Sequence, residues 1–150
     1  MISLSEDPTP NSSMAASRDL PTVERPETIL MVEDNPDVRA MGEALLVEAG
    51  FAVHTAADAD DALDQVRAGL GFDLLFTDIV MPGDLDGIAL AAEVARLRPG
   101  TPVLLTTGWA DRAQDHANQR PDLEMIAKPY RQTDLVRKIR LLLDRGAAGL

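Results

Sequence analysis

Side chains that could take part in chemistry stand at the C-terminal ends of four apolar stretches in this sequence. They are Glu33 and Asp34 after TILMV, Asp78 after LLFT, Thr107 at the end of PVLLTT, and Lys128 after LEMIA. Burying a charge without a partner costs several kcal/mol or more, so a carboxylate at the end of an apolar stretch requires an explanation. Each residue alone fits a helix cap or a solvated strand end. Five of them at corresponding positions favour one shared site.

Such a site would need a cation. Two carboxylates about 4–5 Å apart repel each other by roughly 3–4 kcal/mol at an effective dielectric constant of about 20. Lys128 offsets one negative charge, and an oxygen-only acidic cluster with open positions is the kind of site that Mg²⁺ prefers. A metal ion, a lysine and a hydroxyl are also the groups that stabilise a transferring phosphoryl group. Because aspartate can accept phosphoryl covalently, these residues indicate that Asp78 is a nucleophile.

The positioning elements follow from the hydrophobic pattern. Continuous apolar stretches begin near residues 28, 52, 72, 102 and 123 and alternate with helical segments, which predicts an α/β fold of the form (βα)₅. Such alternation implies a doubly wound, five-stranded parallel sheet with right-handed crossovers. The functional cleft of an open sheet of this kind lies beyond the carboxyl ends of its strands, where the five reactive residues stand.

The helices and the boundaries are predicted from caps and breakers. Asn35 and Pro36 predict the start of the first helix, whose apolar stripe is expected at Val38, Met41, Leu45 and Leu46. The last helix is expected to end near Arg145, with Gly146 beyond it. The fourth helical segment, around residues 110–121, is polar and is expected to be short or mobile. We expect one domain over residues 28–146 and a flexible N-terminal extension over residues 1–27.

Composition excludes several function classes. The chain has 150 residues, a formal net charge of −11 and no cysteine, which excludes disulfides and thiolate metal sites and argues against nucleic acid as a ligand. No apolar run approaches the roughly 18–20 residues that span a membrane, and the first thirty residues lack the apolar core of a secretory signal. We therefore expect a cytoplasmic protein with no membrane or nucleic-acid partner. The basic segment 131–145 is either a docking face or a solvated helix face.

Four motifs resemble those of two-component response-regulator receiver domains: MVEDN, LLFTDIVMPG, PVLLTTG and AKPY. Their separations fit the family, and the resemblance covers all but the N-terminal extension. It extends to single-domain regulators and to the receivers of hybrid histidine kinases. The resemblance implies a chemotaxis-regulator-like, flavodoxin-like fold with the strand order 2-1-3-4-5. It also implies a phosphorelay protein that catalyses only its own phosphorylation and dephosphorylation, rather than an enzyme acting on a separate substrate.

The resemblance assigns a role to each site residue. Asp78 would accept phosphoryl from a histidine kinase or a phosphotransfer protein. Mg²⁺ would be held by Asp34, Asp78 and the backbone carbonyl of Val80, with Glu33 acting through a bound water. Lys128 would pair with the phosphoryl oxygens, and Thr107 would report the phosphorylated state.

The resemblance also implies how the signal leaves the domain. A downstream protein would dock on the fourth helix, the fifth strand and the fifth helix. Only five residues follow Arg145, so we expect output through protein contact. The Lys128–Pro129 peptide bond, often cis in this family, is expected to be cis. The loop MPGDLDG is one residue longer than the common form, and Met125 stands where many members carry Tyr or Phe.

Two alternatives remain open from the residues. A phosphatase that forms an aspartyl phosphate would need a second acid two residues after the nucleophile, and Val80 occupies that position. A binding scaffold of the same fold that is never phosphorylated would have no reason to cluster so many charges.

Overall fold

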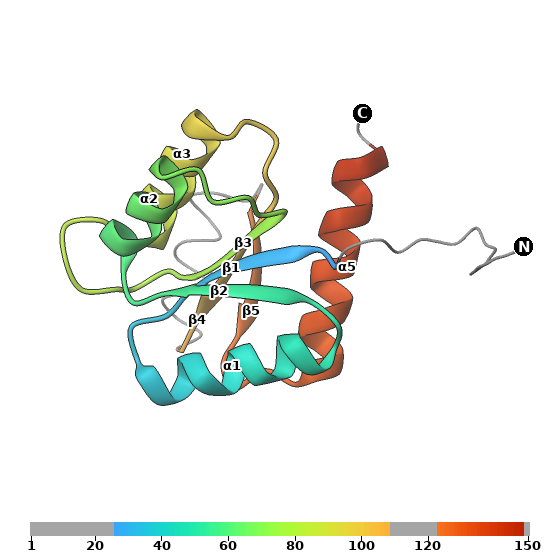
Figure 1. Cartoon of the computed structure of the whole chain (residues 1–150). Coiled ribbons are helices and arrows are strands. Elements are labelled where there is room, and N and C mark those ends of the chain that lie inside the picture. Colours follow the sequence, from blue (N-terminus) through green and yellow to red (C-terminus); the bar gives the residue numbers. More distant parts are fainter. Residues whose placement is uncertain (1–25, 109–122, 149–150) are drawn as a thin grey trace, which may run out of the picture.

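A five-stranded parallel sheet forms the centre of the structure, with the strand order β2-β1-β3-β4-β5. The computed structural model describes residues 26–108 and 123–148. The strands are β1 (Thr28–Val32), β2 (Ala52–Ala56), β3 (Leu74–Asp78), β4 (Val103–Thr107) and β5 (Glu124–Ala127). This arrangement confirms the predicted doubly wound fold, and it places β1 and β3 side by side at the middle of the sheet (Figure 1).

Helices cover both faces of the sheet. They are α1 (Pro36–Glu48), α2 (Ala59–Arg67), α3 (Gly87–Leu97) and α5 (Gln132–Ala148). Helices α1 and α5 lie on one face, and α2 and α3 lie on the other (Figure 1). The predicted fourth helix, residues 110–121, lies outside the described residues. Within the described residues, none of these helices has the length and apolar character needed to cross a lipid bilayer.

Polar caps start the helices at the carboxyl edge of the sheet. The Asn35 side chain accepts hydrogen bonds from the backbone N–H groups of Asp37 (2.9 Å) and Val38 (3.1 Å), as its sequence position predicted. Asp86 caps α3 in the same way. Because α1 begins directly after β1, the short connection between them holds residues 33–35 against the end of the sheet.

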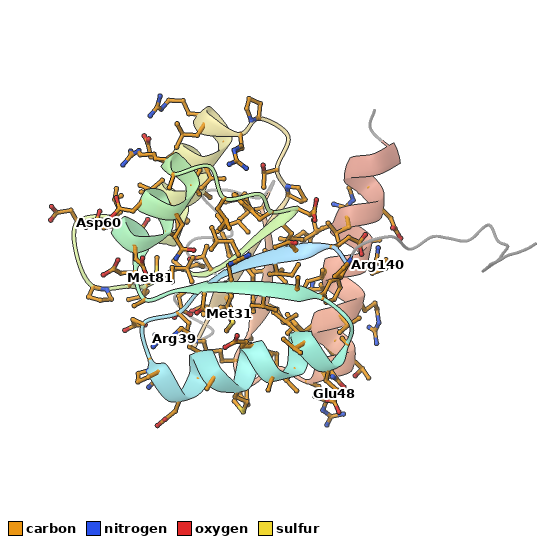
Figure 2. The ribbon with its side chains drawn as sticks, viewed as in Figure 1. Met31, Arg39, Glu48, Asp60, Met81 and Arg140 are labelled. Carbon is orange, nitrogen blue, oxygen red and sulfur yellow. The ribbon has the colours of Figure 1, made fainter. Side chains whose placement is uncertain are left out.

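Side chains on the two faces of the sheet pack into two separate hydrophobic cores. Met31 and Phe76 belong to the cluster that packs against α1 and α5, whereas Val32 and Met81 belong to the cluster under α2 and α3. Figure 2 shows Met31 and Met81 in these two layers. Strands β1, β3 and β4 are buried on both faces, which explains why their sequences read as continuous apolar runs rather than as alternating ones.

Two helix predictions were wrong in detail. Met41, expected in the buried stripe of α1, is 54% exposed, while Gly42 and Leu46 are buried. The reason is that Met31 and the Tyr130 hydroxyl approach the backbone of α1 at Gly42. Helix α5 does not end near Arg145 but continues through Gly146 to Ala148.

Gly87 allows α3 to start directly against the end of β3. Its backbone N–H donates to the Ile79 carbonyl (2.7 Å), and a Cβ added at this position would lie 1.8 Å from the Asp78 carbonyl oxygen. We expect Gly87→Ala to lower the free energy of unfolding by about 3 kcal/mol, because backbone atoms must move to admit the methyl group. Urea unfolding measures this loss.

Gly71 is the matched control for this prediction. A Cβ at Gly71 would meet nothing within 4 Å. Gly71→Ala should therefore change the stability by less than about 0.5 kcal/mol. Equal losses in the two variants would contradict the steric explanation.

Candidate functional site

The six residues predicted for the site line one cavity at the carboxyl edge of the sheet. Its volume is about 440 Å³. Its walls are formed by Glu33, Asp34, Asn35, Val38, Asp78, Val80, Thr107, Gly108 and Lys128. The strand order brings these residues together, because β1, β3, β4 and β5 are consecutive neighbours and all end at this edge.

A single ammonium group joins two buried carboxylates in this cavity. The Lys128 Nζ lies 2.7 Å from Glu33 Oε1 and 2.8 Å from Asp78 Oδ1. Glu33 and Asp78 are 2% and 4% exposed. A buried carboxylate is tolerated only when it is paired and hydrogen-bonded, and the shared lysine supplies that pairing.

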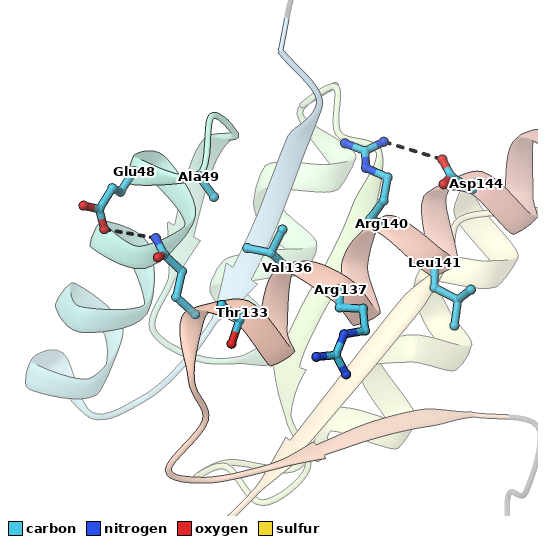
Figure 3. Close-up of a pocket in the computed structure, with 9 residues that line it drawn as sticks. Glu48, Ala49, Thr133, Val136, Arg137, Arg140, Leu141 and Asp144 are labelled. Carbon is cyan, nitrogen blue, oxygen red and sulfur yellow. Dashed lines mark hydrogen bonds and ion pairs between the residues drawn. The ribbon is translucent and has the colours of Figure 1, made fainter.

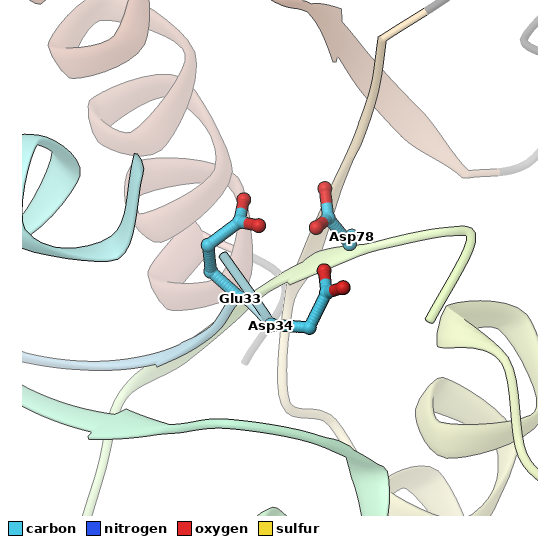
Figure 4. A group of neighbouring side chains, drawn as sticks. All are labelled: Glu33, Asp34 and Asp78. Atoms are coloured by element: carbon cyan, nitrogen blue, oxygen red, sulfur yellow. The ribbon is translucent and has the colours of Figure 1, made fainter. Parts of the chain in front are cut away.

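Three carboxylates converge where a cation would be needed. Oxygen atoms of Glu33, Asp34 and Asp78 all lie within 4.8 Å of one another. Figure 4 shows the three side chains pointing toward a common region. Asp34 is exposed, whereas the other two are buried, so the acidic group opens to solvent on one side. Oxygen ligands with room for water fit Mg²⁺, which is bound through few carboxylates and retains several waters.

The pKa values of the two buried acids are shifted in opposite directions. Burial raises the pKa of Asp78 to about 7; the hydrogen bond from Lys128 opposes this shift, and the neighbouring Glu33 reinforces it. Burial would also raise the pKa of Glu33, but hydrogen bonding to Lys128, Asp78 and the Asn35 N–H lowers it below its usual value. The same two carboxylates outweigh the burial of Lys128 and raise its pKa. Without a metal ion, Asp78 is therefore harder to ionise than Glu33.

The raised pKa of Asp78 leads to an expected pH dependence. Between its unfolded value of 3.8 and about 7, the folded carboxyl holds a proton that the unfolded one has lost. The contribution of Asp78 to stability is therefore present at low pH and disappears as the pH rises through about 7. Glu33, whose pKa is lowered, contributes in the opposite sense below its unfolded value of 4.5.

Urea unfolding in EDTA at about pH 5 and about pH 7.5 tests this dependence. The metal-free protein should be less stable at the higher pH, and saturating Mg²⁺ should reduce the difference because it favours the ionised carboxylate. Asp78→Asn should flatten the profile over the same range. A wild-type profile identical to that of Asp78→Asn would contradict the raised pKa.

Other predicted features are also in place. Thr107 lines the cavity and is 5% exposed, whereas the preceding Thr106 is not among the residues that form its walls. The Lys128–Pro129 peptide bond is cis, as predicted. Val80 lies in the cavity wall, and metal coordination by its carbonyl stays a prediction.

Sequence reasoning missed two contacts that support the acidic group. The Arg39 guanidinium donates to the Glu33 backbone carbonyl (2.8 Å), and the Asn35 N–H donates to the Glu33 carboxylate (3.0 Å). Together they fix the β1–α1 connection from both sides. The position of Arg39, one turn into a helix that starts at the site, is the sequence signal that could have identified it.

Tyr130 was also missed. Its ring packs edge-on against Phe76, with ring centroids 5.6 Å apart. Within the described residues its hydroxyl has no hydrogen-bond partner, and burial raises its pKa to about 12. Tyr130 follows Lys128–Pro129 closely, so its packing holds the segment that carries the lysine.

Comparison with known proteins identifies relatives of this chain. The family model for the response regulator receiver domain matches residues 29–140. The chain is 34% identical over 116 residues to the response regulator receiver protein CpdR of Brucella abortus, in an alignment that covers 77% of this chain and 95% of CpdR. It is also 34% identical over 110 residues to the nitrogen assimilation regulatory protein NtrX of Azorhizobium caulinodans, covering 72% of this chain but only 24% of NtrX.

Solved structures show the same likeness. The response regulator TrrA of Thermotoga maritima, in a complex with Mg²⁺ and BeF, superimposes with a TM-score of 0.68 at 28% sequence identity. The match covers 77% of this chain and 98% of TrrA.

Proposed function

Because this chain belongs to the response regulator receiver family of two-component systems, we propose that it accepts a phosphoryl group on Asp78 and signals by protein contact. The family is one of signalling domains rather than enzymes. The observation that carries the proposal is the shared Lys128 ammonium between two buried carboxylates, beside an exposed third one. A scaffold that is never phosphorylated would gain nothing from this costly grouping of charge.

The transfer assigns a task to each group in the cavity. An Asp78 carboxylate oxygen attacks the phosphorus of a phosphohistidine, the phosphorus–nitrogen bond breaks, and the imidazole leaves. Lys128 lies 2.8 Å from the attacking carboxylate and is placed to neutralise charge on the phosphoryl oxygens. Thr107, in the wall of the same cavity, would donate its hydroxyl to a phosphoryl oxygen and so register the modification.

The acidic group is proposed to bind Mg²⁺. Asp34, Asp78 and the Val80 carbonyl would hold it directly, and Glu33 would act through a bound water. When bound, Mg²⁺ neutralises the carboxylates and the developing charge of the phosphoryl group. TrrA, similar to this chain, was solved with Mg²⁺ and BeF, which supports the assignment.

The proposed partners follow from the same role. A sensor histidine kinase or a phosphotransfer protein would supply the phosphoryl group, and the reaction would take place in the cytoplasm. A downstream protein would recognise β5, α5 and residues 110–121. The basic side chains of α5 suit an acidic partner surface, although Glu124 already pairs with Lys138 (3.5 Å) and Arg145 (3.7 Å).

Phosphorylation by a small-molecule donor tests the function. Incubation with acetyl phosphate and Mg²⁺ should add one phosphoryl group, which peptide mass spectrometry after borohydride trapping should place on Asp78. EDTA should prevent the reaction, and hydroxylamine should remove the label, because an acyl phosphate is labile where a phosphoserine is stable. A failure of acetyl phosphate and of every host histidine kinase to modify the protein would favour the scaffold instead.

A further inference from the structure

An open groove lies between the C-terminal end of α1 and the outer face of α5, and it shares no lining residue with the acidic cavity. Its volume is about 830 Å³. Ala49, Val136 and Leu141 give it apolar surface (Figure 3). Leu141 is 52% exposed. We call this feature the α1–α5 groove. Exposed apolar surface in a groove is typical of a place that another polypeptide segment covers.

The N-terminal part of the chain joins the domain at the rim of this groove. The Glu27 carboxylate accepts two hydrogen bonds from Arg140, at 2.9 and 2.6 Å, and Arg140 is itself a groove residue. The Ala52 N–H donates to the Glu27 carbonyl (3.0 Å), which fixes the backbone at the same point. The described part of the chain therefore begins at this rim.

The reach of the chain matches the groove. The α5 wall extends from Gln132 to Asp144, which is about 18 Å at a helical rise of about 1.5 Å per residue. Six or seven extended residues cover a similar length at about 3.3 Å each. Leu20 and Arg25 both precede proline, which biases them toward extended conformations.

The sequence next to the rim complements the groove chemically. Residues 19–25 read DLPTVER. Leu20 and Val23 match the apolar surface that Ala49, Val136 and Leu141 provide. We propose that residues 19–25 bind in the α1–α5 groove as an extended intramolecular strap. The inference departs from the flexible extension expected from the sequence, and it does not depend on phosphorylation of Asp78.

Charge and tethering favour this occupant over a second copy. Each molecule carries a net charge of −11, so two copies repel each other. A segment attached at the rim has an effective concentration in the millimolar range, so a weak contact is sufficient to keep it bound. A bound strap covers Leu141.

Paramagnetic relaxation in the full-length protein tests the strap. The chain has no cysteine, so Thr22→Cys carries a single nitroxide label. The backbone amide signals of residues 132–141 should lose more than half of their intensity, and those of α2 should be unaffected. Leu20→Ser combined with Val23→Ser, which alters residues outside the described fold, should restore the intensities at least twofold at the Gln132 end of the groove.

Two comparisons make the result decisive. Leu141→Ser should also restore the intensities, whereas Met41→Ser, at an equally exposed position outside the groove, should not. The proposal would be overturned if these two variants had equal effects. It would also be overturned if the double strap variant left the broadening at Gln132 unchanged. Broadening of ¹⁵N-labelled unmodified protein by nitroxide-labelled molecules would also overturn it, and would identify a second copy as the occupant.

Discussion

Asp78→Asn is expected to abolish phosphoryl uptake and, at the same time, to make the metal-free protein more stable. The amide lacks the nucleophilic carboxylate oxygen, so no acyl phosphate forms. Stability should rise because the environment that raises the pKa of Asp78 to about 7 penalises a negative charge there, through burial and the nearby Glu33. At about pH 8, where the carboxylate is ionised, the free energy of unfolding is expected to rise by about 1–3 kcal/mol. Removing the buried negative charge stabilises the variant, but losing the charged hydrogen bond to Lys128 offsets part of this gain.

Asp84 provides the control for this prediction. It is an exposed aspartate of the loop that follows β3. Asp84→Asn should retain phosphoryl uptake and change the stability by less than about 0.5 kcal/mol. Label retained in Asp78→Asn would remove Asp78 as the acceptor, whereas a loss of stability in that variant would show that the Lys128 pairing outweighs the repulsion.

Lys128→Ala is expected to damage both stability and phosphorylation. Removing the lysine leaves two buried carboxylates that are no longer paired at 2.7 and 2.8 Å. Breaking a buried ion pair by removing one partner costs about 3–5 kcal/mol, so the metal-free variant should be strongly destabilised at about pH 8. Phosphoryl uptake from acetyl phosphate should fall by about a hundredfold or more, because the cation that faces the phosphoryl oxygens is lost.

Added Mg²⁺ should recover part of the lost stability of this variant, since a second cation then compensates the carboxylates, but it should not recover the phosphorylation rate. Lys138→Ala is the matched control. Its ion pair with Glu124 is half-exposed and 3.5 Å long, so both properties should remain within about 1 kcal/mol or a fewfold of the wild type. Similar behaviour of the two lysine variants would mean that Lys128 contributes only net charge.

The site was predictable from the sequence because its residues stand at the ends of strands. A parallel sheet places the carboxyl ends of its strands at one edge, and the family resemblance supplied the strand order that brings Glu33, Asp78 and Lys128 together. The chemistry of the side chains then limited what they could do. Neither step required knowledge of side-chain packing.

The features that escaped prediction depend on packing between distant elements. Met41 has the spacing of a core residue, but α1 is rotated so that Gly42 faces the sheet, where Met31 and Tyr130 occupy the space a side chain would need. The contact of Gly87 with the Asp78 backbone has the same character. In both cases the glycine is needed because of a neighbour that is not adjacent in sequence, and periodicity carries no information about that neighbour.

The strand order has a consequence for when the site exists during folding. Glu33 follows β1, Asp78 ends β3 and Lys128 follows β5, so the chain must close two long loops before the three groups meet. Local helices can form early, but the pairing of β1 with β3 and of β4 with β5 is non-local and comes at a cost in folding rate. A cation that binds these groups would recognise the native state and not the unfolded chain, and would add to its stability by mass action. The proposed phosphorylation of Asp78 requires the assembled site, and the site requires the complete sheet. A phosphorylated molecule would therefore be a folded one.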